Sequence, residues 1–175
     1  MRFAILVTTF LLAPLTVAAQ QPANLAASTV AAFVAVADQL PCQQNIAAML
    51  GDIGYRATAA SQDDTDYADI EYAEISGPLL MTVAFERTPI GAQYSVTIDI
   101  AETDAGFADR IIAEMRAALS LAAPVSWENL ARGSAQSWTV TLSGGEARII
   151  VRQYEMKTQI IGILAPLRPG AAVNC

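Results

Sequence analysis

The sequence of 175 residues contains no histidine. Histidine is the usual general base at neutral pH and the commonest protein ligand of zinc, so its absence excludes the Ser-His-Asp and Cys-His catalytic arrangements. The sequence also lacks a Gly-x-x-x-x-Gly-Lys run for binding phosphate and a glycine-rich dinucleotide fingerprint. Few familiar catalytic mechanisms are left. We therefore expect a protein that is not an enzyme and that binds no cofactor.

Cysteine is scarce, because only Cys42 and Cys175 occur. In an exported chain, an even number of cysteines without metal-ligand spacing predicts one disulfide, here between Cys42 and Cys175. The alternatives are an intermolecular bond through Cys175 and two free thiols. The predicted bond closes a loop longer than a hundred residues, which the chain-entropy model equates with about 5 kcal/mol of stability, less any native strain.

Basic side chains are outnumbered, with 10 Lys and Arg against 17 Asp and Glu. Nucleic acids and anionic lipids favour basic patches, so we expect neither as a partner. The imbalance is uneven: residues 20–104 carry twelve acidic and two basic side chains, whereas residues 105–175 carry five acidic and seven basic ones. We expect the two halves to attract each other across the fold. The alternative is that the acidic half docks a cationic partner.

The first nineteen residues have the three-part order of a cleavable secretory signal peptide. Arg2 precedes an apolar stretch over residues 3–17, and the small residues Ala18 and Ala19 precede Gln20. The stretch contains Pro14 and is shorter than the roughly 20 residues of a membrane-spanning helix. We expect cleavage after Ala19, a periplasmic or extracellular location and no stable membrane anchor after cleavage. An uncleaved anchor is the alternative.

Residues 20–175 are sufficient for a single domain with its own core. Apolar residues spaced by three and four predict helices over 24–39, from 41 to Gly51 or Gly54, and over 105–121 with Asp104 as N-cap. Alternating apolar and polar residues predict strands over 55–59, 69–75, 79–86, 94–100, 138–142, 147–151 and 157–164. Residues 127–134 are expected to form a connector, and residues 165–175 an irregular tail.

These elements predict an α+β fold, with an antiparallel sheet or sheets packed by two main helical segments. The first segment is a bent pair of helices with Cys42 at the corner. The order helix–strands–helix–strands suggests a weak internal duplication, although no residue-level repeat accompanies it.

The sharpest polar cluster contains six carboxylates: Asp63, Asp64, Asp66, Asp69, Glu71 and Glu74. Several carboxylates within twelve residues can supply oxygen ligands to calcium. An EF-hand loop also needs regular ligand spacing, a glycine at its sixth position and a closing glutamate, and this pattern fails. We therefore expect a solvated acidic turn and no metal site. Tyr67 and Tyr72 are expected to be sheet residues and not stacking platforms.

Other polar and aromatic residues have an ordinary structural interpretation beside a functional one. Asp99, Glu102 and Glu128 are formal candidates for a two-carboxylate hydrolase, and Lys157 for the base of a lone serine. We expect Arg148 and Arg152 to form a solvent-facing row on one strand face, with an anion site as the alternative. We expect Trp127 and Trp138 to pack in the core or at an edge, with an exposed indole in a binding groove as the alternative.

Together these features predict a small, soluble, exported binding or interaction protein that is not an enzyme. The expected partner is another envelope protein or an apolar small molecule, bound through the sheet face or a cleft between helix and sheet. The alternatives are a carboxylate-dependent hydrolase of envelope polymers and an inhibitor or secretion accessory protein. Two clustered carboxyl groups with shifted pKa values in one pocket would favour the hydrolase.

Overall fold

The computed structural model describes residues 25–40, 42–61, 67–75, 77–101, 103–104, 106–121, 124, 126–130, 133–154 and 156–165. This part of the chain contains the helices α1 (Leu25–Asp38), α2 (Gln43–Asp52) and α3 (Phe107–Leu119). The strands are β1 (Tyr55–Ser61), β2 (Tyr67–Glu74), β3 (Leu79–Thr88), β4 (Gly91–Ile100), β5 (Ser126–Leu130), β6 (Gly133–Leu142), β7 (Gly145–Tyr154) and β8 (Lys157–Leu164). The α+β class is confirmed. The predicted signal peptide and the predicted tail after residue 165 lie outside the described residues.

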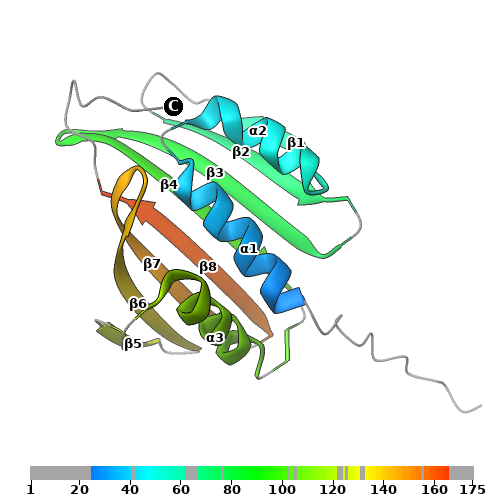
Figure 1. The fold of residues 1–175 in the computed structure, drawn as a ribbon, viewed down its shortest axis with the longest axis vertical. Helices are drawn as coiled ribbons and strands as arrows, with labels where there is room; N and C mark the ends of the chain where they lie inside the picture. The colour runs from blue at the N-terminus through cyan, green and yellow to red at the C-terminus, as the bar shows by residue number, and fades with distance from the viewer. Residues whose placement is uncertain are drawn as a thin grey trace, which may run out of the picture.

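All eight strands form one antiparallel sheet in the order β1-β2-β3-β4-β8-β7-β6-β5. Two meanders of four strands therefore meet where β4 pairs with β8. The helices cover one face of the sheet (Figure 1). Helix α1 contacts β4, β8 and α3, while α3 covers β7 and α2 covers β1. Helix α1 thus lies over the junction between the two meanders.

Helix α1 is buried on a broad face because it packs against both the sheet and α3. Val30, Phe33 and Ala37, which the apolar spacing places on one stripe, are at most 2 % exposed. Phe33 lies against Gly162 of β8, where an added Cβ would come within 2.9 Å of the phenyl ring. Full burial of such a ring contributes about 1.5–3 kcal/mol, so this contact is an important part of the core.

The central strands alternate as their sequence predicts. On β3, Leu79, Met81 and Val83 are buried. The β4 residues opposite them, Ile100, Ile98 and Val96, are also buried, so both sets lie on the helix-covered face. The β6–β7 hairpin forms at the predicted Gly144–Gly145 turn, where Gly145 has φ = 128°, a conformation that strongly favours glycine.

Two expectations about local structure need correction. The segment over residues 127–134, expected to be a connector, contains most of the edge strand β5, which pairs with β6. This strand is specified by its hydrogen bonds to β6 and not by a clear alternation of apolar and polar residues. Helix α3 begins at Phe107 with Gly106 at the N-cap. Asp104 lies two residues before the cap, and its carboxylate accepts hydrogen bonds from the Gly106 N–H at 2.9 Å and from Arg110 at 2.7 Å.

The buried face of α3 also differs from the expected one. Ala108 and Ile112 are buried, whereas Ala118, which the spacing placed on the apolar face, is exposed. The reason is that α3 packs against α1 as well as the sheet, so its buried face is broader at the start of the helix. No helix in the described ranges is long and apolar enough to cross a membrane.

Candidate ligand-binding site

Strand β2 divides the acidic cluster. Ile70, Tyr72 and Glu74 share the helix-covered face, as the alternation predicts, and Tyr72 is 3 % exposed and part of the core. Asp69 and Glu71 lie on the opposite face, where they accept hydrogen bonds from the hydroxyls of Tyr67 (3.2 Å) and Thr58 (2.9 Å). The described carboxylates therefore do not gather at one point.

The other members of the cluster, Asp63, Asp64 and Asp66, lie outside the described residues. Within the described ranges, no group of three or more Asp, Glu or Cys side chains is placed to hold a metal ion. The tyrosine hypothesis is confirmed for Tyr72, which is a buried sheet residue.

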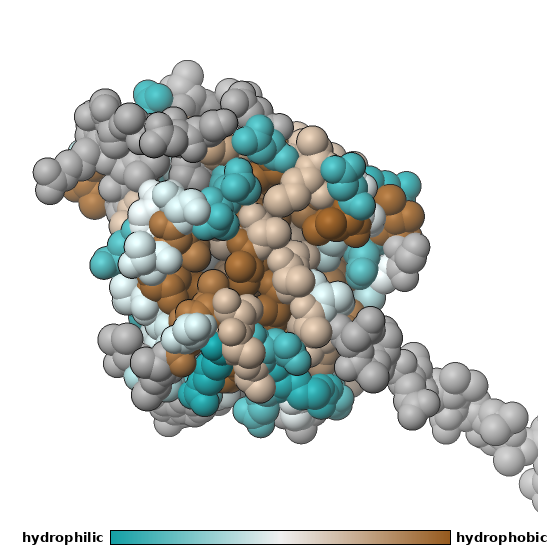
Figure 2. Space-filling model, viewed as in Figure 1, coloured by the Kyte–Doolittle hydropathy of each residue, from teal (hydrophilic) through white to brown (hydrophobic). Residues whose placement is uncertain are grey.

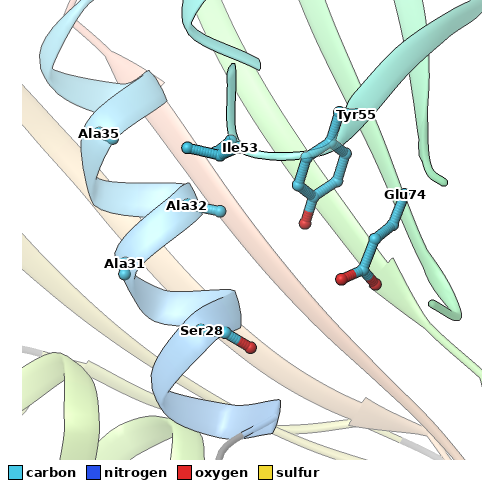
Figure 3. Close-up of a pocket in the computed structure, with 7 residues that line it drawn as sticks. All are labelled: Ser28, Ala31, Ala32, Ala35, Ile53, Tyr55 and Glu74. Atoms are coloured by element: carbon cyan, nitrogen blue, oxygen red, sulfur yellow. The ribbon is translucent and has the colours of Figure 1, made fainter. Parts of the chain in front are cut away.

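A groove with a volume of about 290 Å³ lies between α1 and a second wall, which is formed by the turn after α2, the start of β1 and the end of β2 (Figure 3). One wall is a stripe of small side chains on α1: Ser28, Ala31, Ala32 and Ala35. These positions follow the i, i+3, i+4, i+7 spacing of one helix face. The opposite wall consists of Ile53, Tyr55 and Glu74. Its volume is close to the lower end of the range for ligand pockets, about 300–1,000 Å³.

The surface around the groove is largely apolar. Figure 2 shows the pale, weakly hydrophobic surface of α1 with strongly hydrophobic side chains beside it, while hydrophilic side chains gather at the periphery of this face. The small residues of α1 leave space that larger side chains would occupy, and this space is what the groove consists of.

Backbone pairing fixes the far wall of the groove. Tyr55 and Glu74 are directly opposite each other in the β1–β2 ladder, so their side chains point to the same face. The Ile75 N–H donates to the Gly54 carbonyl at 2.8 Å, which joins the end of β2 to the turn after α2. Gly54 itself has φ = 93°. This turn places Ile53 beside Tyr55 at the edge of the groove.

The groove has a polar end and an apolar end. In Figure 3, the hydroxyls of Ser28 and Tyr55 and the carboxyl group of Glu74 point into one end, and Ala35 and Ile53 lie at the other. The Ser28 hydroxyl donates to the Leu25 carbonyl at 3.1 Å, which leaves its oxygen able to accept. Tyr55 is 5 % exposed, and no hydrogen bond joins its hydroxyl to another described residue.

Glu74 supplies the charge of the site. Its Oε2 atom is buried and has no hydrogen-bond partner. The carboxyl group packs against Gly77, where an added Cβ would collide with it, so the glycine makes room for the carboxyl group. Burial is the main cause of the raised pKa of the Tyr55 hydroxyl, and the negative charge of Glu74 raises this pKa further. None of the described residues that line the groove is basic.

The structure does not combine the described hydrolase candidates. The Asp99 carboxylate forms an ion pair with Lys157 at 2.8 Å and accepts a hydrogen bond from Gln159 at 3.0 Å, across the β4–β8 junction. Lys157 is the first residue of β8 and is engaged by this ion pair. Glu102 lies outside the described residues, and the side chain of Glu128 does too. The contact between Asp99 and Lys157 is an attraction between the acidic and the basic half of the chain.

Arg148 and Arg152 share one face of β7, as expected from their spacing. Arg148 is exposed, but Arg152 is half-buried and its Nε atom is buried, so the expected solvent-facing row holds for Arg148 alone. The Arg148 guanidinium donates to the Ser137 hydroxyl and that of Arg152 to the Tyr154 hydroxyl, both at 3.4 Å. Trp138 is 2 % exposed and lies in the core, which confirms the packing interpretation. The side chain of Trp127 lies outside the described residues.

The predicted disulfide is described at one end only. Cys42 is 6 % exposed and lies between α1 and α2, at the expected corner, where its N–H donates to the Gln39 carbonyl at 2.7 Å. Cys175 lies outside the described residues. The bond between them therefore stays a prediction.

The sequence interpretation included Glu74 in the acidic cluster but did not identify the other groove residues. A usable signal was present, because Ser28, Ala31, Ala32 and Ala35 form a stripe of small residues at helical spacing. Comparison with protein family models, with curated proteins and with solved structures finds no match to this chain.

Proposed function

We propose that this protein is an exported binding protein, not an enzyme, that holds an apolar small molecule in the groove between α1 and the wall formed by Ile53, Tyr55 and Glu74. The observation that carries this proposal is the groove itself, which has a volume of about 290 Å³ and is lined by seven described residues, four of them alanine or isoleucine. Mostly apolar lining with a few convergent polar groups is typical of small-molecule sites.

Binding is favoured over hydrolysis because the described lining of the groove contains a single carboxyl group, that of Glu74. A two-carboxylate mechanism needs an acid and a second carboxylate on opposite sides of one bond. The described acidic residues nearest to Glu74 in the sequence, Glu71 and Asp69, both lie on the opposite face of β2. The groove therefore offers recognition and orientation.

A neutral apolar dye, N-phenyl-1-naphthylamine, tests the groove through its fluorescence. Ala31 and Ala27 are both exposed on α1, but only Ala31 lines the groove. Ala31→Phe should fill the space and weaken dye binding by about tenfold or more, which corresponds to roughly 1.4 kcal/mol. Ala27→Phe, the matched control, should bind like the unmodified protein. Equal binding by all three proteins would show that the groove is not the site.

Export is the second part of the proposal, and the order of Arg2, the apolar stretch and the small residues before Gln20 supports it. Mass analysis of the protein recovered from the producing cell should give Gln20 as the first residue. Recovery of most exported protein with residues 1–19 attached would contradict cleavage.

We also propose that the chain arose by internal duplication of a unit made of a helical segment followed by a four-stranded meander. Two such meanders, β1–β4 and β5–β8, meet through their last strands. Superposition of the two units on each other checks this proposal. A fit of the four strands without a fit of α1 on α3 would contradict it.

A further inference from the structure

We propose that the ligand is a small amphiphile with an alkyl body and a primary ammonium head, whose head binds Ser28, Tyr55 and Glu74 and whose body lies along Ala35 and Ile53. This inference rests on the proposed function and specifies its ligand class. It follows from the number of acceptors at the polar end, from their charge and from the opening at the apolar end.

A primary ammonium group has three N–H donors and no acceptor. The described side chains at the polar end of the groove present three oxygen-bearing groups and no nitrogen. The Ser28 oxygen can accept because its own proton is directed to the Leu25 carbonyl. The Tyr55 hydroxyl, on a nine-tenths buried residue, has no hydrogen bond to another described residue. Glu74 supplies the third acceptor, so donors and acceptors match in number.

The negative charge of Glu74 favours a cationic head group on the ligand. Among the described residues that line the groove, Glu74 is the only charged one, and its Oε2 atom is buried without a hydrogen-bond partner. A partly buried carboxylate without a compensating positive charge is unfavourable, and an ammonium group at the polar end would supply that charge together with a charge-assisted hydrogen bond to the carboxyl group. A carboxylate or phosphate head would instead be repelled by Glu74. A neutral alcohol could form hydrogen bonds there but would leave the charge uncompensated.

The apolar end accounts for the alkyl body. Ala35 and Ile53 lie at this end, and the Ile53 side chain is 48 % exposed (Figure 3). An alkyl chain directed from the polar end past Ala35 would cover Ile53 and remove apolar surface from water. The position of the head at Glu74 thus gives the chain a definite direction.

Isothermal titration calorimetry with octylamine, octan-1-ol and sodium octanoate at pH 7 and constant ionic strength tests the inference on the purified protein. The three probes share one chain length and differ in the charge of the head. Octylamine should bind at least about tenfold more tightly than octan-1-ol, and octanoate more weakly than octan-1-ol. Glu74→Gln should remove the preference for octylamine over octan-1-ol.

Glu86→Gln is the matched control, because Glu86 is an exposed β3 residue outside the groove and loses the same charge. It should retain the full preference for octylamine. Gly77→Ala is a second variant, in which the added Cβ displaces the Glu74 carboxyl group without removing it. It should weaken octylamine binding selectively. Circular dichroism and thermal midpoints establish that each variant is folded before it is titrated.

The outcomes separate the two proposals. If octan-1-ol binds and octylamine binds no more tightly, or if Glu74→Gln keeps the preference, the ligand class is wrong and the groove function stands. If none of the three probes binds the folded protein, the proposed function fails and the ligand class fails with it. Loss of the preference in Glu86→Gln would assign it to net charge and overturn the role of Glu74.

Discussion

Ser143, in the turn between β6 and β7, donates its backbone N–H and its hydroxyl to the two carboxylate oxygens of Asp38 at the end of α1, each at 2.8 Å. The two residues are 105 positions apart. Because α1 forms one wall of the groove and Ser143 belongs to the β5–β8 meander, this pair joins the end of the helix to that half of the sheet.

Asp38→Ala should lower the free energy of unfolding by about 1 kcal/mol, because it removes two hydrogen bonds that are partly exposed to solvent. Urea denaturation measures the change. Asp52→Ala, at the exposed end of α2, is the control and should change stability by less than about 0.5 kcal/mol. A double-mutant cycle with Ser143→Ala should give a coupling energy above about 0.5 kcal/mol. Additive effects would show that the pair does not stabilise the fold.

Gly162→Ala should lower the free energy of unfolding by about 1–3 kcal/mol through overpacking. The added Cβ would lie 2.9 Å from the Phe33 ring and 3.2 Å from a Val96 methyl group, and both residues are completely buried. Phe33→Leu in the same chain should relieve part of this loss. Gly51→Ala in α2, where nothing lies within 4 Å, is the control and should be neutral or slightly stabilising. An equal effect of both substitutions would contradict the close contact.

Stability should fall at alkaline pH because of Tyr55. Its pKa is raised by burial and by the nearby charge of Glu74, whereas an unfolded tyrosine titrates near pH 10. Above about pH 10 the unfolded chain therefore loses a proton that the folded chain retains. The contribution of the neutral hydroxyl is complete below about pH 10 and is lost as the pH rises through the folded pKa. Tyr55→Phe should make the decline between pH 9 and 11 shallower in urea titrations.

The cause of this shift can be tested separately. Glu74→Gln should lower the pKa of Tyr55 in a spectroscopic titration of tyrosinate, since it removes the charge contribution and leaves burial in place. Glu86→Gln should not change it. An unchanged Tyr55 pKa in Glu74→Gln would show that the carboxyl group does not act on the hydroxyl.

The Cys42–Cys175 bond should be intramolecular, and Cys42→Ser should then destabilise the protein by several kcal/mol, with about 5 kcal/mol as the limit of the entropic estimate. Non-reducing digestion of the monomer should yield one linked peptide pair. Reduction of the disulfide in the unmodified protein is the control and should cause a similar loss of stability. Two alkylatable thiols in freshly isolated protein, or a disulfide-linked dimer as the main species, would contradict the pairing.

Much of the fold could be predicted, because local patterns along the chain specify it. The bounds of β8, Lys157–Leu164, match the predicted strand, and the alternation of Leu79, Met81 and Val83 identified the buried face of β3. Strand β5 was not identified, because a short edge strand is specified by its pairing with β6 more than by its own alternation. The prediction of the buried face of α3 was partly wrong, because the packing of α1 against this helix widens its buried face.

The candidate site was less predictable than the fold. The periodicity of α1, the alternation of β2 and the helix-covered position of Glu74 follow from the sequence, because neighbouring residues along the chain set the direction of each side chain. The proximity of Ser28 to Tyr55 and Glu74 does not follow from the sequence. It depends on the register between β1 and β2 and on α1 crossing the β4–β8 junction, which are long-range contacts that no local pattern encodes. For that reason the sequence shows an acidic segment, and the packed chain shows one carboxyl group at the end of an apolar groove.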